Sequence, residues 1–132
     1  MNQKEIVRIE RSLGFALPDS YSAFLLDFPQ RLVDAYPDDH SPRERELFNT
    51  SEPIISTNTL VREPNSKWPD KFLIVGMDIG TNFRCIDRQL SKSPVYLWFH
   101  EDGEFEKIAT SLAKYVDKLI ENYVAYRKEL GN

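Results

Sequence analysis

Two histidines and one cysteine are the side chains of this chain best suited to metal or nucleophilic chemistry. They are His40, His100 and Cys85. A metal site would need both histidines to meet nearby carboxylates, and a cysteine nucleophile would need a histidine base beside it. The position of Cys85 within an alternating apolar segment indicates a small core residue instead. We expect His100 to end a strand and His40 to lie in solvent.

Known catalytic and nucleotide-binding motifs are incomplete in this sequence. His100-Glu101 could begin a zinc-protease motif, but Glu104 occupies the place of the required second histidine. Gly76 and Gly80 flank Asp78, yet neither phosphate-binding glycine pattern is present, and Gly80 fits a hairpin turn. We therefore predict a non-enzymatic domain with no catalytic residue, no cofactor and no metal.

Acidic side chains gather in two stretches, which we take as candidate partner-binding residues. The stretches are Asp27, Asp34, Asp38 and Asp39, and the predicted hairpin with Glu101, Asp102, Glu104 and Glu106. An acidic surface attracts a basic partner and speeds their encounter, although solvated acidic loops are also common. Two of the hairpin carboxylates could alternatively form an acid–base pair. Trp68 and Trp98 could line a ligand site, and Trp98 could contact a helix or a partner.

Composition and charge describe one soluble globular domain spanning residues 1–132. Of these residues 41% are hydrophobic and 29% are charged, and the net charge is −4. Residues 1–66 hold 7 basic and 11 acidic residues, whereas residues 67–132 hold 10 of each. Without a basic face, direct binding to nucleic acid is not expected. The lack of a long apolar run or signal peptide predicts no membrane insertion, and the single cysteine predicts a cytoplasmic setting.

Apolar residues recur at helical spacing in four segments. These segments predict helices over about 3–13, 18–28, 51–61 and 111–130. Asn2 is the predicted N-cap of the first helix, Ser51 that of the third, and Thr110 or Ser111 that of the last. Three prolines between residues 29 and 46 indicate a long surface connection, followed by a short strand around Leu47 and Phe48.

Alternating apolar residues predict four strands in the second half of the chain. They cover about 72–79, 83–87, 95–100 and 105–108. Local turns join these strands, so the sheet should be mainly antiparallel. With helices packed on one face, an N-terminal helix pair and a long C-terminal helix, the expected fold class is α+β.

The order of motifs resembles a known family. Residues 10–25 read E-x-x-L-G-x-x-L-P-x-x-Y-x-x-F-L, which is similar to the N-terminal signature of the SUKH superfamily, the Smi/Knr-like proteins. The segment Gly76 to Gly80 resembles the mid-sheet turn of that family, and Pro94 to Glu101 resembles its penultimate strand. Residues 108–119 resemble the entry to its closing helix.

This resemblance implies a compact α+β domain without enzymatic chemistry. Bacterial members are mostly regarded as immunity proteins, which bind a cognate toxin in the cytoplasm and so neutralise it. We accordingly expect a protein partner, such as a nuclease toxin domain whose basic substrate groove would be covered. Related members regulate fungal cell walls or bind the export machinery, so a regulatory scaffold with an endogenous partner is the alternative. A small hydrolase using His40 or His100 is a third possibility.

Overall fold

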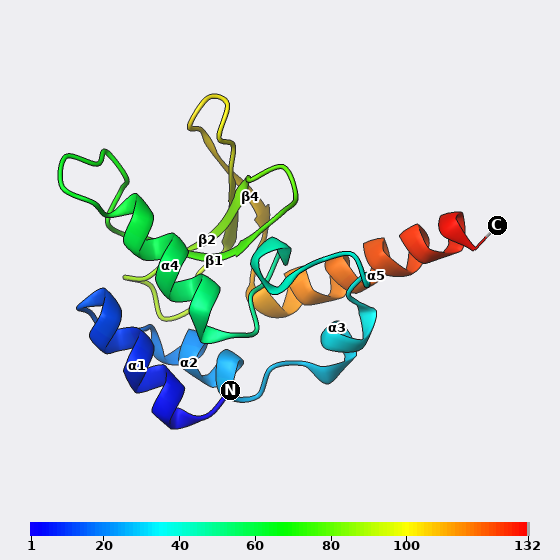
Figure 1. The fold of residues 1–132 in the computed structure, drawn as a ribbon, viewed down its shortest axis with the longest axis horizontal. Coiled ribbons are helices and arrows are strands. Elements are labelled where there is room, and N and C mark those ends of the chain that lie inside the picture. The colour runs from blue at the N-terminus through cyan, green and yellow to red at the C-terminus, as the bar shows by residue number, and fades with distance from the viewer. Residues whose placement is uncertain (132) are drawn as a thin grey trace.

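The computed structural model describes residues 1–131, which form an α+β domain around one antiparallel sheet (Figure 1). The helices are α1 (Gln3–Leu13), α2 (Asp19–Leu26), α3 (Gln30–Ala35), the 3-10 turn η1 (Pro42–Glu44), α4 (Ser51–Val61) and α5 (Leu112–Leu130). The strands are β1 (Phe72–Met77), β2 (Phe83–Asp87), β3 (Val95–Trp98) and β4 (Phe105–Ala109), in that order across the sheet. The predicted fold class is confirmed. No helix within residues 1–131 is both long and apolar enough to cross a bilayer.

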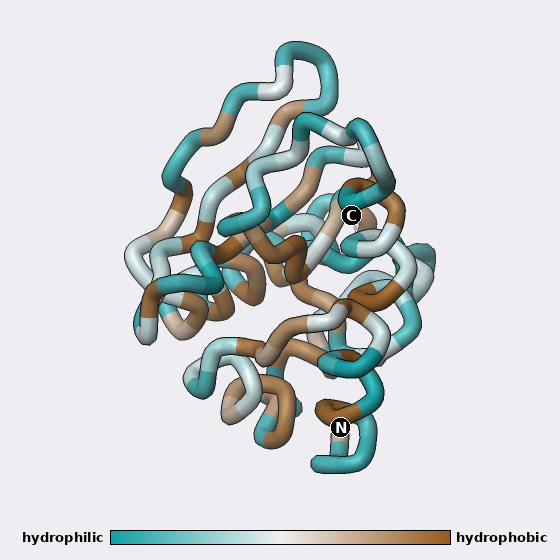
Figure 2. Tube along the Cα trace, turned by 90° about the vertical axis from the view of Figure 1, so that its left-hand side faces the viewer, coloured by the Kyte–Doolittle hydropathy of each residue, from teal (hydrophilic) through white to brown (hydrophobic). Residues whose placement is uncertain are grey.

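The first and last helices begin where their caps predict. The Asn2 side chain accepts a hydrogen bond from the Glu5 backbone N–H at 3.0 Å. The Ser111 hydroxyl accepts one from Lys114 N–H at 3.1 Å, which selects Ser111 over Thr110 as the cap. These bonds satisfy backbone donors that the first helical turn leaves free. Figure 2 shows the hydrophobic segments gathered in the interior, while the loops at the top are hydrophilic.

Residues 29–46 are not the surface connection that their prolines predicted. The segment contains α3, whose Leu32 and Ala35 are buried, and Tyr36 directly after it is buried as well. The α3 helix packs against α5, and the Arg127 guanidinium donates to the backbone oxygen of Tyr36 at 2.9 Å. A six-residue helix is too short to show a clear periodicity or to be stable alone. Its stability comes from this distant partner.

The segment after η1 covers the outer edge of β1. Met77 N–H donates to Arg45 O, and Phe48 N–H donates to Val75 O, both at 2.8 Å. The expected strand around Leu47 and Phe48 is therefore an extended segment with two edge hydrogen bonds, without a full strand ladder. This pairing shields backbone groups that would otherwise be free for another chain.

Helix α4 completes the cover of the same edge. The buried Asn58 side chain donates to Ile74 O and accepts from Ile74 N–H, both at 2.8 Å. The prediction of Ser51 as N-cap is wrong, because Thr50 occupies the cap position without a side-chain bond. Ser51 is instead the first helical residue, and its buried hydroxyl accepts from Arg8 of α1 at 3.2 Å.

Candidate partner-binding surface

Four aromatic side chains form a continuous surface on one face of the sheet. Phe83 lies opposite Trp98 in the β2–β3 register, and Trp98 lies opposite Phe105 in the β3–β4 register. Opposed residues of antiparallel strands share a face. Trp68, from the loop after α4, packs edge-on against all three, with ring centroids 5.4–5.9 Å apart. We call these four residues the aromatic surface.

The aromatic surface is held in place by specific contacts. The Trp68 indole N–H donates to Phe72 O at 2.9 Å. Phe83 and Trp98 stack at 4.9 Å with 14° between their planes, and Phe105 stacks on the buried Phe72 at 4.2 Å. Each of the four rings is nevertheless only half-buried. Rigid aromatic rings that stay partly exposed provide contact area at a low cost in conformational entropy.

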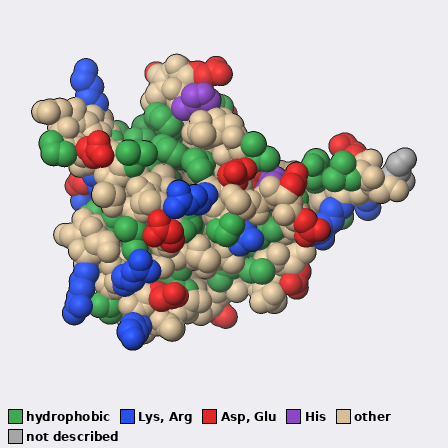
Figure 3. All heavy atoms as spheres, viewed as in Figure 1, with side chains coloured by type: hydrophobic (Ala, Val, Ile, Leu, Met, Phe, Trp, Pro, Cys, Tyr) green, Lys and Arg blue, Asp and Glu red, His purple; other side chains and the backbone are tan. Residues whose placement is uncertain are grey.

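Two hollows border the aromatic surface. One hollow of about 440 Å³ lies between the 62–69 loop and the hairpin, with Trp68, Trp98 and Phe105 in its wall. A second of about 350 Å³ is lined by Phe83 and by the exposed Leu60. Figure 3 shows hydrophobic side chains gathered between the projecting loop and the hairpin at the top. Contiguous apolar surface of this kind is typical of an interaction site.

The β3–β4 hairpin places acidic side chains at the rim of this surface. Glu101, Asp102 and Glu104 are exposed and form no ion pair within the described part of the chain. Gly103, between Asp102 and Glu104, has φ 71° and lines the hollow of about 440 Å³. Glu106 does not belong to this group. It lies opposite Leu97, next to the Trp98–Phe105 pair, and successive residues of a strand point to opposite faces, so Glu106 is on the other face of the sheet.

The other acidic stretch lies elsewhere, around α3 and beneath α5 in Figure 1. Its members Asp27, Asp34, Asp38 and Asp39 are all exposed. Cations lie close to this stretch, because Arg31 pairs with Asp117 at 2.7 Å and Arg127 donates to the backbone oxygen of Asp34. The fold thus separates the two predicted acidic stretches, and only the hairpin borders the aromatic surface.

The residues considered for metal or nucleophilic chemistry do not come together. The prediction that His40 lies in solvent is wrong. Its side chain is only 10% exposed, and its ring lies edge-on to Tyr123 of α5. The cause is the buried α3 region, which brings His40 next to α5. His100 is exposed at the end of β3, with Nδ1 2.8 Å from Asn82 Oδ1. Cys85 is fully buried, and this burial raises the pKa of its thiol. Within residues 1–131 no three His, Cys, Asp or Glu side chains are grouped as metal ligands.

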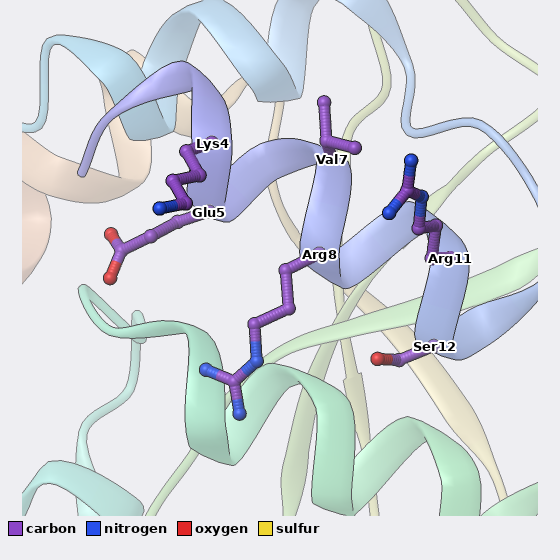
Figure 4. A pocket seen from close by; sticks show the side chains of 6 residues that line it. All are labelled: Lys4, Glu5, Val7, Arg8, Arg11 and Ser12. Carbon is purple, nitrogen blue, oxygen red and sulfur yellow. The ribbon is translucent and has the colours of Figure 1, made fainter.

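Another hollow, of about 810 Å³, runs along the outside of α1. Figure 4 shows that its six lining side chains all come from this one helix and point in different directions. Arg8 points toward α4, where it donates to Ser51, while Arg11 points the opposite way. Side chains that do not converge cannot hold a ligand, so we assign no site here.

Of the four rings, the sequence singles out only Trp68 and Trp98, as side chains that could line a ligand site, and gives no sign of Phe83 and Phe105. The pattern of apolar residues places both phenylalanines in predicted strands and indicates nothing more. The signal that could have found them is the strand register, since Phe83, Trp98 and Phe105 share a face once the strands are aligned.

Comparison with known proteins gives one result at the level of a family. No curated protein and no solved structure matches the chain. Residues 1–118, from before α1 into the first part of α5, match the model of the SMI1 / KNR4 family (SUKH-1). This match agrees with the motif order of residues 10–119, and the chain belongs to the SMI1 / KNR4 family (SUKH-1).

Proposed function

We propose that this domain is a non-enzymatic binding module that acts in the cytoplasm as an immunity protein, capturing a cognate toxin through the aromatic surface. The observation that carries the proposal is the group of four half-buried rings, Trp68, Phe83, Trp98 and Phe105, on a rigid sheet. Aromatic anchors, tryptophan above all, supply much of the binding energy at protein interfaces. Membership of the SMI1 / KNR4 family supports a protein partner.

The acidic hairpin supports a partner with a basic surface. Glu101, Asp102 and Glu104 lie at the rim without an ion pair to residues 1–131. Charges at the rim of an interface act mainly on the rate of association. A nuclease toxin has a basic groove for its substrate, and a bound acidic hairpin would occupy that groove. Asp27, Asp34, Asp38 and Asp39 lie in and around α3, and their role as a second contact stays a prediction.

Co-expression with the C-terminal domain of a large toxin encoded beside this gene tests the proposal. We expect growth to be rescued and the two chains to co-purify as a stoichiometric complex. Co-purification with an endogenous cell-wall or secretion protein, without rescue, would favour the regulatory scaffold instead. Failure of rescue when both chains are expressed and folded would contradict the immunity function.

Association should depend on the hairpin charges. We expect the paired change Glu101→Gln and Asp102→Asn to slow association about three- to tenfold at low ionic strength, because it removes two charges that attract a basic partner. Asn at position 102 keeps the side-chain oxygen that accepts from Glu104 N–H. The matched control, Glu121→Gln with Glu129→Gln, removes two exposed charges from α5 and should leave the rate nearly unchanged. Stopped-flow rates that are equal for both variants, or insensitive to salt, would disprove this steering.

A further inference from the structure

A small cavity lies between α5 and the sheet, on the face opposite the aromatic surface. Its volume is about 200 Å³, and Leu97 and Ile108 form part of its wall. In the β2–β3 register Arg84 lies opposite Leu97, and this pair directly follows the Phe83–Trp98 pair along the strands. Because successive side chains of a strand point to opposite faces, Arg84 and Leu97 lie on the other face of the sheet. The polar side chains that line the cavity are Glu46, Arg84, Tyr115, Lys118, Asn122 and Tyr123.

Glu46 lines this cavity without a Lys or Arg partner. Its side chain is 13% exposed, and the one basic group within 4 Å in residues 1–131 is His40, with Nδ1 at 3.9 Å from Oε2. The Tyr123 hydroxyl donates to the same carboxylate. Burial and the Glu46 charge both raise the pKa of Tyr123, so this hydroxyl remains a proton donor. A largely buried carboxylate without a Lys or Arg partner favours a cationic group beside it.

Arg84 supplies the opposite charge in the same cavity. Its side chain is 12% exposed; Nη1 contacts Asp78 Oδ2 at 2.6 Å and Nε donates to the Tyr115 hydroxyl at 2.8 Å. Its Nη2 makes no hydrogen bond to another residue of 1–131. Arg84 and Glu46 are not within ion-pair distance of each other. The cavity therefore presents the Glu46 carboxylate and an Arg84 N–H that has no partner in residues 1–131, beside the Arg84–Asp78 ion pair. A tyrosine hydroxyl contacts each of the two groups.

The position of Glu46 is set in advance by the fold. The hydrogen bonds from Met77 to Arg45 and from Phe48 to Val75 fix the backbone on both sides of it. Gly76 allows this close approach, because a Cβ there would lie 1.9 Å from Glu46 O. A charged group held by backbone pairing is preorganised for a ligand, and a rigid site loses little entropy on binding.

We propose that this cavity binds a small zwitterion of the amino-acid type. The ammonium group of the ligand lies at Glu46, and its carboxylate lies at Arg84 Nη2 and the exposed Lys118. The volume is below the ~300–1,000 Å³ of pockets for drug-sized ligands, so only a molecule of a few heavy atoms fits. Because the cavity and the aromatic surface lie on opposite faces, this site is independent of toxin capture.

Titration of the purified domain with each standard amino acid, followed by calorimetry and by amide NMR shifts, tests the proposal. We expect at least one amino acid to bind saturably and to shift residues of α5 between 115 and 123. Acetate and methylamine, each carrying half of the zwitterion, should bind about tenfold more weakly or worse. Glu46→Gln should weaken binding by a similar factor, whereas Glu121→Gln, on the exposed face of the same helix, should bind as the parent does.

Two outcomes would overturn the proposal. One is the absence of saturable binding of every amino acid by the folded parent domain. The other is binding that is unchanged by Glu46→Gln. If Glu46→Gln does not fold, Lys118→Ala and Asn122→Ala take its place, because both side chains are on an exposed part of α5. Unaltered affinity in both of these variants would equally reject the site.

Discussion

Replacing Trp98 with alanine is expected to weaken capture of the toxin by roughly 30- to 150-fold. Trp98 is the central ring of the aromatic surface, because it stacks on Phe83, meets Trp68 edge-on and lies opposite Phe105. Truncation of a central aromatic anchor commonly costs about 2–3 kcal/mol of binding energy, and each 1.4 kcal/mol is about tenfold in Kd. Calorimetry with the toxin domain obtained by co-purification measures the change.

The control for Trp98→Ala must separate lost contact from lost folding. Leu130→Ala removes an apolar side chain that is 69% exposed near the far end of α5 and should leave Kd unchanged. Thermal unfolding of both variants shows whether the sheet survives. A Trp98→Ala domain that folds and binds within about twofold of the parent would remove the aromatic surface from the interface.

The elements that could be predicted from the sequence are those whose signals are local. In α1 the apolar stripe begins after a capping Asn2 and ends at Gly14, which has φ 81°. Helix α5 likewise has its cap at Ser111 and its stripe within one segment. In such helices the N-cap residue, the apolar stripe and the C-terminal residue all lie within one short segment of the sequence. The antiparallel sheet was predictable for the same reason, since each strand pairs with its neighbour in the chain.

Elements stabilised by distant residues could not be predicted in this way. Helix α3 is six residues long, and its cover comes from α5, some 90 positions later. The burial of His40 has the same cause, because Tyr123, against which its ring packs, comes from α5. Composition and periodicity give no information about such contacts, because they describe only a short stretch of neighbouring residues.

The candidate sites also differ in how far local sequence signals predict them. Trp68 and Trp98 are conspicuous by type, but their neighbours Phe83 and Phe105 join them only through the register of three strands. The cavity of Glu46 and Arg84 gives no signal in the sequence, because its charges come from an edge segment and a strand. Acidic runs, in contrast, are easy to see, and the fold alone shows that one of the two borders the aromatic surface.

Gly76→Ala is expected to destabilise the domain by about 3 kcal/mol or more. A Cβ at this position would lie 1.9 Å from Glu46 O and 2.9 Å from Leu47 N. Both are backbone atoms, so no side-chain rotation can relieve the overlap, and the 45–48 segment must move away from β1. That movement breaks the Met77–Arg45 and Phe48–Val75 hydrogen bonds. Overpacking costs about 1–3 kcal/mol, and each lost hydrogen bond adds about 1 kcal/mol.

Urea or thermal unfolding measures this loss, and Gly80→Ala is the matched control. At Gly80 the nearest atoms to an added Cβ are side-chain atoms of Asp78 and Asn82, at 3.3 and 3.5 Å, which can shift. For a domain of this size we expect Gly76→Ala to lower Tm by about 10 °C or more, and Gly80→Ala to change it by only a few degrees. Equal Tm values for the two variants would show that the 45–48 segment is not clamped to β1. Since that clamp also positions Glu46, the same result would remove the preorganisation on which the zwitterion site depends.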